Sequence, residues 1–330
     1  MLVLSKNNVM KAITMLEAIN AVEAAFTDYY LNRAKIPLRT RIHCDEANGD
    51  LLFMPAYMSD LGGMGIKIVS VFPNNINCGK PTISAVVLLN NVETGEPLAI
   101  MDATHLTALR TGAASGVATK YLANKQASKL ALFGTGGQAL RQLEAMLEIR
   151  PIEEVYLFDT DKNRVKDFVM LSEKELSRFN FKIKVANTPR DAVLDADIVV
   201  TATTSRKPVF SGNDFKPGAH INGMGSYTPE MQEIDETTIT RADKIVIDSF
   251  EASFKEAGDL VIPIGKGRLR QEDIYCEIGK ITCGEISGRE REEEITFFKS
   301  VGIAAQDISV AKLIYENALL KGLGETVDIA

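Results

Sequence analysis

Hydrophobic and polar positions follow two different patterns along the chain. From residue 129 onward, short apolar runs alternate with segments whose apolar residues recur at helical spacing. Such alternation is typical of α/β proteins, in which buried parallel strands are joined by helices that cover both faces of the sheet. We expect the strands at 129–133, 154–158, 182–186, 197–202, 219–223 and 244–248, with helices at 161–178 and around 191–194.

The first 120 residues have another pattern. Apolar residues at helical spacing predict a helix over Ala18–Tyr29 and a small-residue helix over 107–123. Strand-like pieces separated by turn signals predict a mixed, mainly antiparallel sheet. These pieces lie around 38–43, 51–54, 66–72 and 84–90. A last helical pattern at 308–320 is expected to return to this region, which gives an N-terminal domain of 1–120 with 306–330 and a second domain of 121–305.

The glycine-rich stretch 129–139 is the clearest chemical signal. An apolar run ends at Gly134 and leads into a helical pattern with the spacing Gly134-x-Gly136-x-x-Ala139. This is the strand, turn and helix that binds a dinucleotide pyrophosphate in a Rossmann-type doubly wound sheet. Cofactor contacts are therefore expected along the loop, from the residues Gly134, Thr135, Gly136, Gly137 and Gln138.

Asp159 identifies the preferred nicotinamide cofactor. It ends the next apolar run, 23 residues after Gly136, close to the spacing of about 20 expected for the acid that binds an adenosine ribose. A carboxylate there accepts hydrogen bonds from a 2′-hydroxyl and repels a 2′-phosphate. We therefore expect NAD(H), while the nearby cations Lys162 and Arg164 leave NADP(H) open.

Composition excludes several classes of partner. The net charge of −7 argues against nucleic acid and anionic membrane surfaces, and no apolar run approaches the ~20 residues that span a bilayer. The chain start lacks the features of a secretory signal. The four cysteines have no zinc-binding spacing. We expect a cytoplasmic protein with reduced thiols, no metal site, no nucleic-acid partner and no membrane association.

Three cations in the N-terminal domain lie in unusual surroundings. Lys67 interrupts an apolar run, Arg110 stands in a nearly uncharged segment, and Arg39 belongs to a strand-like piece. A cation in apolar surroundings needs a partner, because burying it alone is costly. A substrate carboxylate would serve, since a guanidinium binds it in a two-pronged geometry. The alternative is that each cation is solvated or pairs with a structural Asp or Glu.

Several stretches besides the glycine loop match one known family. They are Pro37-Leu38-Arg39-Thr40, Met54-Pro55-Ala56-Tyr57, Lys67–Asn74, Thr94-Gly95-Glu96-Pro97, Leu106–Ser115, His220–Gly225 and Ser300–Asp307. Through these stretches the chain resembles, nearly from end to end, the ornithine cyclodeaminase and mu-crystallin family of nicotinamide-dependent proteins.

The resemblance implies a substrate, a cofactor and an assembly. It implies a homodimer whose N-terminal domains pair through their sheets. It also implies that Arg39, Lys67 and Arg110 surround the carboxylate of an amino or imino acid beside the nicotinamide, where Lys67 could also polarise the carbon–nitrogen centre. Further cofactor contacts are expected in the matching stretches, from Thr111, Met224, Ser300 and Gly302.

One segment departs from the cyclodeaminase pattern. Ornithine cyclodeaminases have Gly-Gly-Asp after the strand that corresponds to 220–224, whereas this chain has Gly225-Ser226-Tyr227. A tyrosine with a pKa near ~10 is a poor base at neutral pH. The segment is similar to that of cyclic ketimine reductases, so we expect reduction of 1-pyrroline-2-carboxylate or 1-piperideine-2-carboxylate, with Tyr227 as a hydrogen-bond donor or a packing residue.

Three other functions stay open. Ornithine cyclodeaminase activity would release ammonia and proline from L-ornithine. Some relatives resemble alanine dehydrogenase, which oxidises an open-chain amino acid. Mu-crystallin-like members act as cofactor-dependent binding proteins, although a set of cations for a carboxylate argues against a purely binding role.

Overall fold

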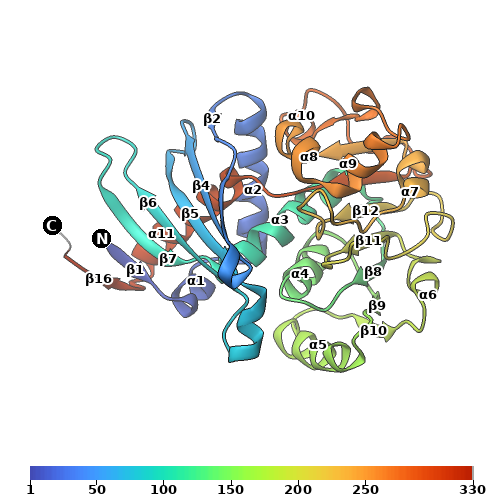
Figure 1. Ribbon diagram of the computed structural model, residues 1–330, viewed down its shortest axis with the longest axis horizontal. Helices are drawn as coiled ribbons and strands as arrows, with labels where there is room; N and C mark the ends of the chain where they lie inside the picture. Colours follow the sequence, from blue (N-terminus) through green and yellow to red (C-terminus); the bar gives the residue numbers. More distant parts are fainter. Residues whose placement is uncertain (329–330) are drawn as a thin grey trace. The chain divides into compact units, whose positions relative to one another are not determined.

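The computed structural model describes residues 1–328 and divides into two compact units (Figure 1). The first unit combines Met1–Arg110 with the C-terminal segment that starts at Ile303, and the second is Thr111–Gly302. The chain passes between the units within helix α3 (Thr104–Leu122) and again after Gly302. None of the helices described is long and apolar enough to cross a membrane.

The first unit contains an eight-stranded sheet in the order β16-β1-β7-β6-β5-β4-β2, with β3 paired to β4. All neighbouring strands are antiparallel except β1 and β7, which confirms the predicted mixed, mainly antiparallel sheet. The strands are β1 (Leu2–Leu4), β2 (Ala34–Lys35), β3 (Thr40–Cys44), β4 (Gly49–Met58), β5 (Gly63–Val71), β6 (Ile83–Asn90), β7 (Pro97–Asp102) and β16 (Glu325–Thr326). The accompanying helices are α1 (Lys6–Ala12), α2 (Met15–Tyr30) and α11 (Ala304–Leu320), with short 3₁₀ helices at Asp45–Ala47 and Pro73–Cys78.

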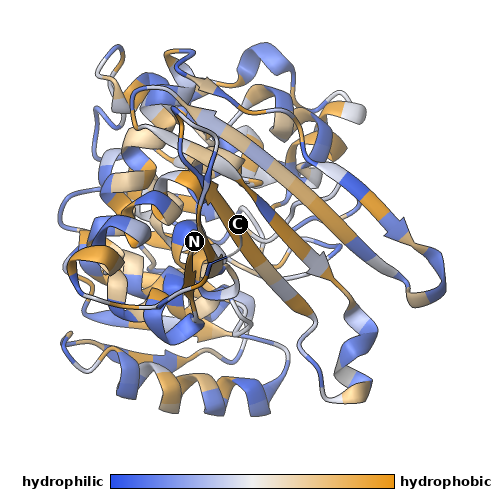
Figure 2. Cartoon of the chain, turned by 90° about the vertical axis from the view of Figure 1, so that its left-hand side faces the viewer, coloured by the Kyte–Doolittle hydropathy of each residue, from blue (hydrophilic) through white to orange (hydrophobic). Residues whose placement is uncertain are grey.

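Helix α11 packs on this sheet, as the sequence predicts. It contacts β4, β5 and β6 as well as α2. Side chains alternate along the strands, because successive residues point to opposite faces. Met54, Ala56 and Met58 are buried on β4, whereas the residues between them are half-buried. Figure 2 shows apolar positions along these strands.

The second unit is a parallel sheet in the order β10-β9-β8-β11-β12-β15-β13-β14. The order reverses between β8 and β11, and a ligand crevice lies at such a reversal, outside the carboxyl ends of the strands. The strands are β8 (Lys129–Phe133), β9 (Glu154–Phe158), β10 (Lys182–Val185), β11 (Ile198–Thr201), β12 (His220–Gly223), β13 (Lys244–Ile247), β14 (Cys276–Glu277) and β15 (Thr296–Lys299). The helices are α4 (Ala139–Ile149), α5 (Lys162–Glu175), α6 (Pro189–Val193), α7 (Glu236–Arg241), α8 (Phe250–Glu256), α9 (Gly258–Gly265) and α10 (Ile278–Thr282), with a 3₁₀ helix at Gln271–Asp273.

All six strands expected after residue 129 are present, and the predicted α/β class is confirmed. The central strands β11, β12, β13 and β15 are buried along their whole length, as is typical of a parallel sheet covered on both faces. Strand β15, the last strand of this unit, was not predicted from the sequence; it inserts between β12 and β13. Its four residues follow the charged segment Arg289–Glu294 and are too few to show a periodic pattern.

Candidate active site

The glycine loop forms one wall of a cavity in the second unit. Gly134 follows β8 with φ of +94°, and a Cβ there would lie 2.7 Å from the Ala202 carbonyl oxygen. Only glycine fits this turn. Gly136 faces open space, and α4 begins without a side-chain cap. Uncapped N–H groups at a helix start favour an anion, so the loop fits a dinucleotide pyrophosphate.

Asp159 lies at the end of β9, beside this loop. Its Oδ2 accepts hydrogen bonds from the backbone N and the Oγ1 of Thr135, both at 2.8 Å, and its Oδ1 accepts one from the Asp161 N at 2.9 Å. Burial raises the pKa of Asp159, but the hydrogen bonds from Asp161 and Thr135 outweigh it and hold the pKa below its ordinary value. The carboxylate is therefore ionised, as an acceptor for ribose hydroxyls must be.

The cavity at the carboxyl ends of β8, β9 and β11 has a volume of about 530 Å³, which is in the range of small-molecule sites. Of the predicted cofactor residues, Gly134, Gly136 and Asp159 line it. The side of the cavity near Asp159 also carries Asp161 and Arg164, so both signs of charge are present there. The complete lining is Phe133, Gly134, Gly136, Phe158–Asp161, Arg164, Ala202–Ser205 and Val209.

Other predicted cofactor residues lie further along the same edge of the sheet. Met224 follows β12, and Ser300 and Gly302 follow β15. The Ser300 hydroxyl and the Gly302 N–H both donate to Oδ2 of the buried Asp248, at 2.7 and 2.8 Å. Asp248 thus fixes the segment that leaves β15. Thr111 is buried on α3, directly after Arg110.

A buried carboxylate fixes the segment that contains Tyr227. Glu233 accepts hydrogen bonds from the backbone N of Thr203, Gly225 and Ser226 and from the hydroxyls of Thr203 and Thr201, at 2.6–3.2 Å. A Cβ on Gly225 would lie 2.2 Å from the Thr203 carbonyl oxygen, so the two loops touch through backbone. Tyr227 itself is 38% exposed. Glu233 was not predicted from the sequence, because no local motif marks it.

The predicted cations meet in the first unit, at a buried acid. Asp307, in the first turns of α11, is completely buried. Its Oδ2 accepts a hydrogen bond from Lys67 Nζ at 2.8 Å, and its Oδ1 accepts one from Arg110 Nε at 3.0 Å. The neighbouring Gln306 Oε1 accepts a bond from Arg110 Nη1 at 2.7 Å. The two cations come from β5 and α3, far apart in sequence.

Arg39 belongs to the same cluster. It lies in the loop between β2 and β3, one residue before the strand in which it was expected, and is half-buried. Burial lowers the pKa of Lys67 to about 7; Asp307 opposes this shift, whereas the charges of Arg110 and Arg39 add to it. Lys67 and Arg110 therefore pair with a structural aspartate. Arg39 is a third cation close enough for its charge to act on Lys67.

The role of Asp307 as the buried partner of two cations was not predicted from the sequence. Its position near the start of a helix is typical of an N-terminal cap, yet the cap of α11 is Ile303, without a side-chain hydrogen bond. The pKa of Asp307 is raised by burial, but Arg110 and Lys67 outweigh this effect and lower it below its ordinary value. Asp307 is thus a carboxylate shared by two of the cations. The residues described contain no cluster of side chains suited to a metal ion.

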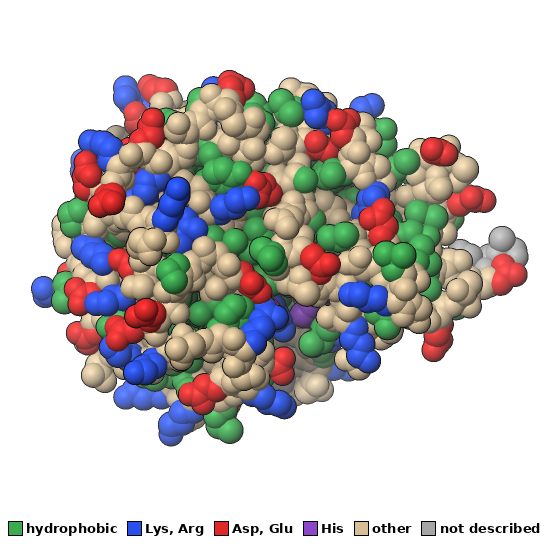
Figure 3. All heavy atoms as spheres, turned by 180° about the vertical axis from the view of Figure 1, so that it is seen from behind, with side chains coloured by type: hydrophobic (Ala, Val, Ile, Leu, Met, Phe, Trp, Pro, Cys, Tyr) green, Lys and Arg blue, Asp and Glu red, His purple; other side chains and the backbone are tan. Residues whose placement is uncertain are grey.

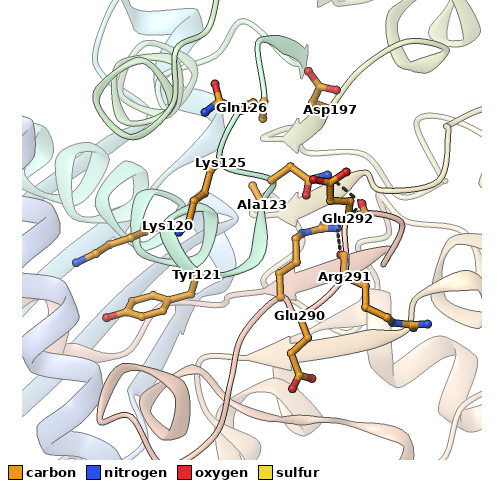
Figure 4. Close-up of a pocket in the computed structure, with 12 residues that line it drawn as sticks. Lys120, Tyr121, Ala123, Lys125, Gln126, Asp197, Glu290, Arg291 and Glu292 are labelled. Carbon is orange, nitrogen blue, oxygen red and sulfur yellow. Dashed lines mark hydrogen bonds between the residues drawn. The ribbon is translucent and has the colours of Figure 1, made fainter.

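A second cavity in the second unit, of about 460 Å³, lies at the opposite edge of the sheet (Figure 4). Ala127 and Asp197 on its wall precede β8 and β11, so it faces the amino ends of these strands. Figure 4 shows both Lys125 and Glu292 at its wall. Its place at the amino ends of the strands distinguishes it from the cavity at the glycine loop, which lies at their carboxyl ends.

Comparison with known proteins agrees with this fold. The model of the ornithine cyclodeaminase/mu-crystallin family matches residues 1–322, and the chain belongs to this family. The chain is 40% identical to a Delta(1)-pyrroline-2-carboxylate reductase of Bacillus cereus, over 99% of this chain and 100% of the relative.

Two solved structures are also similar over their whole length. One is the Delta(1)-pyrroline-2-carboxylate reductase of Thermococcus litoralis in complex with NADH and L-proline, with a TM-score of 0.94, 42% identity, and coverage of 99% of this chain and 100% of that one. The other is an archaeal alanine dehydrogenase dimer with bound NAD, with a TM-score of 0.92, 40% identity, and coverage of 100% and 99%.

Proposed function

We propose that this protein uses NAD(H) to reduce a cyclic imino acid, 1-pyrroline-2-carboxylate or 1-piperideine-2-carboxylate, to L-proline or L-pipecolate. The observation that carries the proposal is the pairing of Lys67 and Arg110 with one buried acid, with a third cation, Arg39, close enough to act on Lys67. Full-length similarity to two pyrroline-2-carboxylate reductases supports the choice of substrate.

The cations of the first unit would hold the substrate. A guanidinium has five N–H donors, and the bonds of Arg110 to Asp307 and Gln306 use two of them. Arg110 and Arg39 can therefore bind a carboxylate while Asp307 keeps Arg110 in place. A carboxylate fixed by several cations leaves C2 of the imine in a defined position, which lowers the entropic part of the barrier.

The second unit would hold the cofactor. Gly134 and Gly136 allow the pyrophosphate to approach the start of α4, and Asp159 accepts hydrogen bonds from the adenosine ribose. We include Thr135, Gly137, Gln138, Thr111, Met224, Ser300 and Gly302 among the cofactor-binding residues, and Tyr227 as a donor near the ring nitrogen. When bound, the nicotinamide supplies the hydride. NADP(H) is the less favoured cofactor because Asp159 would repel a 2′-phosphate.

A second candidate function is oxidation of an open-chain amino acid. It is favoured by the 40% identity to an alanine dehydrogenase, since the same cations could bind the carboxylate of alanine. Ornithine cyclodeamination is less favoured, because Tyr227 stands where cyclodeaminases have an aspartate. A ligand-binding role without turnover is the remaining alternative.

An assay panel distinguishes these functions. Both cyclic imines, L-ornithine and L-alanine are offered with each cofactor, and NADH absorbance and ammonia release are followed. We expect NADH oxidation that depends on a cyclic imine. Ammonia release from ornithine, or NADH formation from alanine alone, would contradict the proposal, and tight binding without turnover of any compound would favour the binding role.

We further propose that the protein is a cytoplasmic homodimer. One face of the first sheet carries apolar side chains that are only half-buried in the single chain, among them Phe53, Ile66 and Leu88, while Val86 on this face is exposed. Strand register makes Phe53, Ile68 and Val86 neighbours. A continuous apolar sheet face suits a second copy, and the similar alanine dehydrogenase is a dimer. Light scattering after gel filtration tests this.

No nucleic acid is proposed as a partner. On the face shown in Figure 3, acidic and basic side chains are interspersed. A nucleic-acid surface would gather basic side chains on one face, and the net charge of the chain is −7. The proposed partners are the imino acid, the nicotinamide cofactor and a second copy of the chain. The four cysteines, which are free thiols in the structure, suit a reducing compartment.

A further inference from the structure

We propose that Asp307 is a positioning residue of the reduction, which keeps Lys67 as the ammonium that protonates the imine nitrogen. This inference rests on the proposed function and extends it to the source of the proton. The buried carboxylate lies 2.8 Å from Lys67 Nζ and 3.0 Å from Arg110 Nε. It would thereby couple the group that gives the proton to one that binds the substrate.

The geometry gives each oxygen of Asp307 a separate partner. Oδ2 accepts from Lys67, and Oδ1 accepts from Arg110. Helix α11 packs directly on β5, the strand that carries Lys67. Gln306, one residue earlier on the same helix, accepts the second bond from Arg110. The first turns of α11 thus fix both cations. Lys67 is 1% exposed and Arg110 is 7% exposed, so both side chains have little freedom to move.

The reaction requires a proton as well as a hydride. C2 of the imine accepts the hydride, and the two electrons of its C=N π bond move to the nitrogen. The nitrogen forms its new N–H bond with a proton from the Lys67 ammonium, which becomes a neutral amine. NADH is oxidised to NAD⁺. Lys67 regains a proton from water before the next turnover, and Asp307 remains a carboxylate throughout.

Charged groups on three elements act on Lys67. Asp307 on α11 stabilises its ammonium, whereas Arg110 on α3 and Arg39 in the β2–β3 loop destabilise it. Burial is the largest effect and lowers the pKa of Lys67 to about 7. A donor with a pKa near the working pH is efficient in both giving and regaining a proton. Without Asp307, burial and two guanidinium groups would leave Lys67 neutral.

The protonation state of Lys67 can be measured without catalysis. In protein labelled with ¹³C at lysine Cε, the resonance lost in Lys67→Arg identifies Lys67, and its pH titration gives the midpoint. We expect a wild-type midpoint near 7, and a midpoint lower by about one pH unit or more in Asp307→Asn, since an opposite charge this close shifts a pKa by 1–3 units. Asp28→Asn is the matched control, because Asp28 is a buried aspartate of the same unit whose charged neighbours are Asp60 and Arg33.

An unchanged midpoint in Asp307→Asn would overturn the proposal, and so would a wild-type midpoint near the ordinary value of 10.5. The wild-type midpoint can be measured even if the Asp307→Asn variant does not fold. A fold control is NADH binding, followed by cofactor fluorescence. If the wild-type protein reduces no cyclic imine, the proposed function fails, and the titration still shows whether Asp307 sets the protonation of Lys67.

The pH dependence of kcat provides the catalytic test. We expect the wild-type rate to fall as pH rises through about 7 and the fall to occur at lower pH in Asp307→Asn. Lys67→Arg should still bind the planar analogue pyrrole-2-carboxylate but lose about a hundredfold or more in kcat, since an arginine is too weak an acid to give up its proton. Asp307→Glu, which keeps the charge, should recover part of the wild-type profile. Identical profiles in wild type and Asp307→Asn would refute the role of Asp307.

Discussion

Replacement of Arg110 by alanine tests the proposed substrate site, because Arg110 is the cation that bonds to both Asp307 and Gln306. Arg110 lies on α3 and is 7% exposed, and its guanidinium bonds to Asp307 and Gln306. The substitution removes these bonds together with the proposed contact to the substrate carboxylate. Both activity and stability should fall, for different physical reasons.

The two losses can be worked out separately. A hydrogen bond that involves a charged group contributes about 1.5–3 kcal/mol, so losing the substrate contact should reduce kcat/KM by about 10- to 140-fold. Breaking a buried ion pair costs about 3–5 kcal/mol. Lys67 still pairs with Asp307 in this variant, so we expect the lower end, a loss of about 3 kcal/mol in the free energy of unfolding.

The assay follows NADH oxidation with 1-pyrroline-2-carboxylate, and urea denaturation gives the stability. Arg33→Ala is the matched control, because Arg33 is an arginine of the same unit in an exposed pair with Asp60. It should change the free energy of unfolding by no more than about 1 kcal/mol. Arg110→Lys, which restores the charge but not the planar fork, should be intermediate. An unchanged kcat/KM in Arg110→Ala would refute the assignment of the carboxylate site.

Four further outcomes are expected. Asp159→Ser should raise the ratio of kcat/KM for NADPH to that for NADH by about tenfold or more, because it removes the charge that repels a 2′-phosphate; an unchanged ratio would argue against a ribose contact. Glu233→Gln should lower the free energy of unfolding by about 3 kcal/mol in urea denaturation, since an amide NH₂ cannot accept the five donors around this carboxylate, and a loss below about 1 kcal/mol would contradict this role. Ile68→Arg should convert a dimer to a monomer in light scattering if the apolar sheet face is the interface. The pKa of Lys67 in the folded protein, about 7, lies below its ordinary value of 10.5. Between these pH values the unfolded chain binds more protons than the folded protein, so the free energy of unfolding should rise with pH. Urea denaturation at a series of pH values should show this rise in the wild type and not in Lys67→Met.

The class of fold and the glycine loop could be predicted from local patterns in the sequence. Strands and helices of the second unit follow from apolar runs and helical periodicity, because a covered parallel strand must be apolar throughout. The glycine loop and Asp159 are local signals as well, since a turn with positive φ at Gly134 and a carboxylate at a strand end depend on neighbours in sequence. The positions of Lys67 and Arg110 in nearly uncharged segments made them candidates, whereas their grouping with Arg39 as a carboxylate site was implied by the resemblance to the family.

The contacts of these cations depend on how distant parts of the chain pack together. Asp307 follows Lys67 by 240 residues, and no periodic pattern can show that α11 returns one aspartate to the middle of β5. The sequence likewise gives no sign that Glu233 accepts five bonds from two separate loops. Strand β15 was missed because its place between β12 and β13 depends on pairing rather than on its own four residues. Local sequence patterns predict helices and strands. The partner of a buried charge depends on which polar groups lie beside it in the packed chain, because a buried charge without a partner is costly.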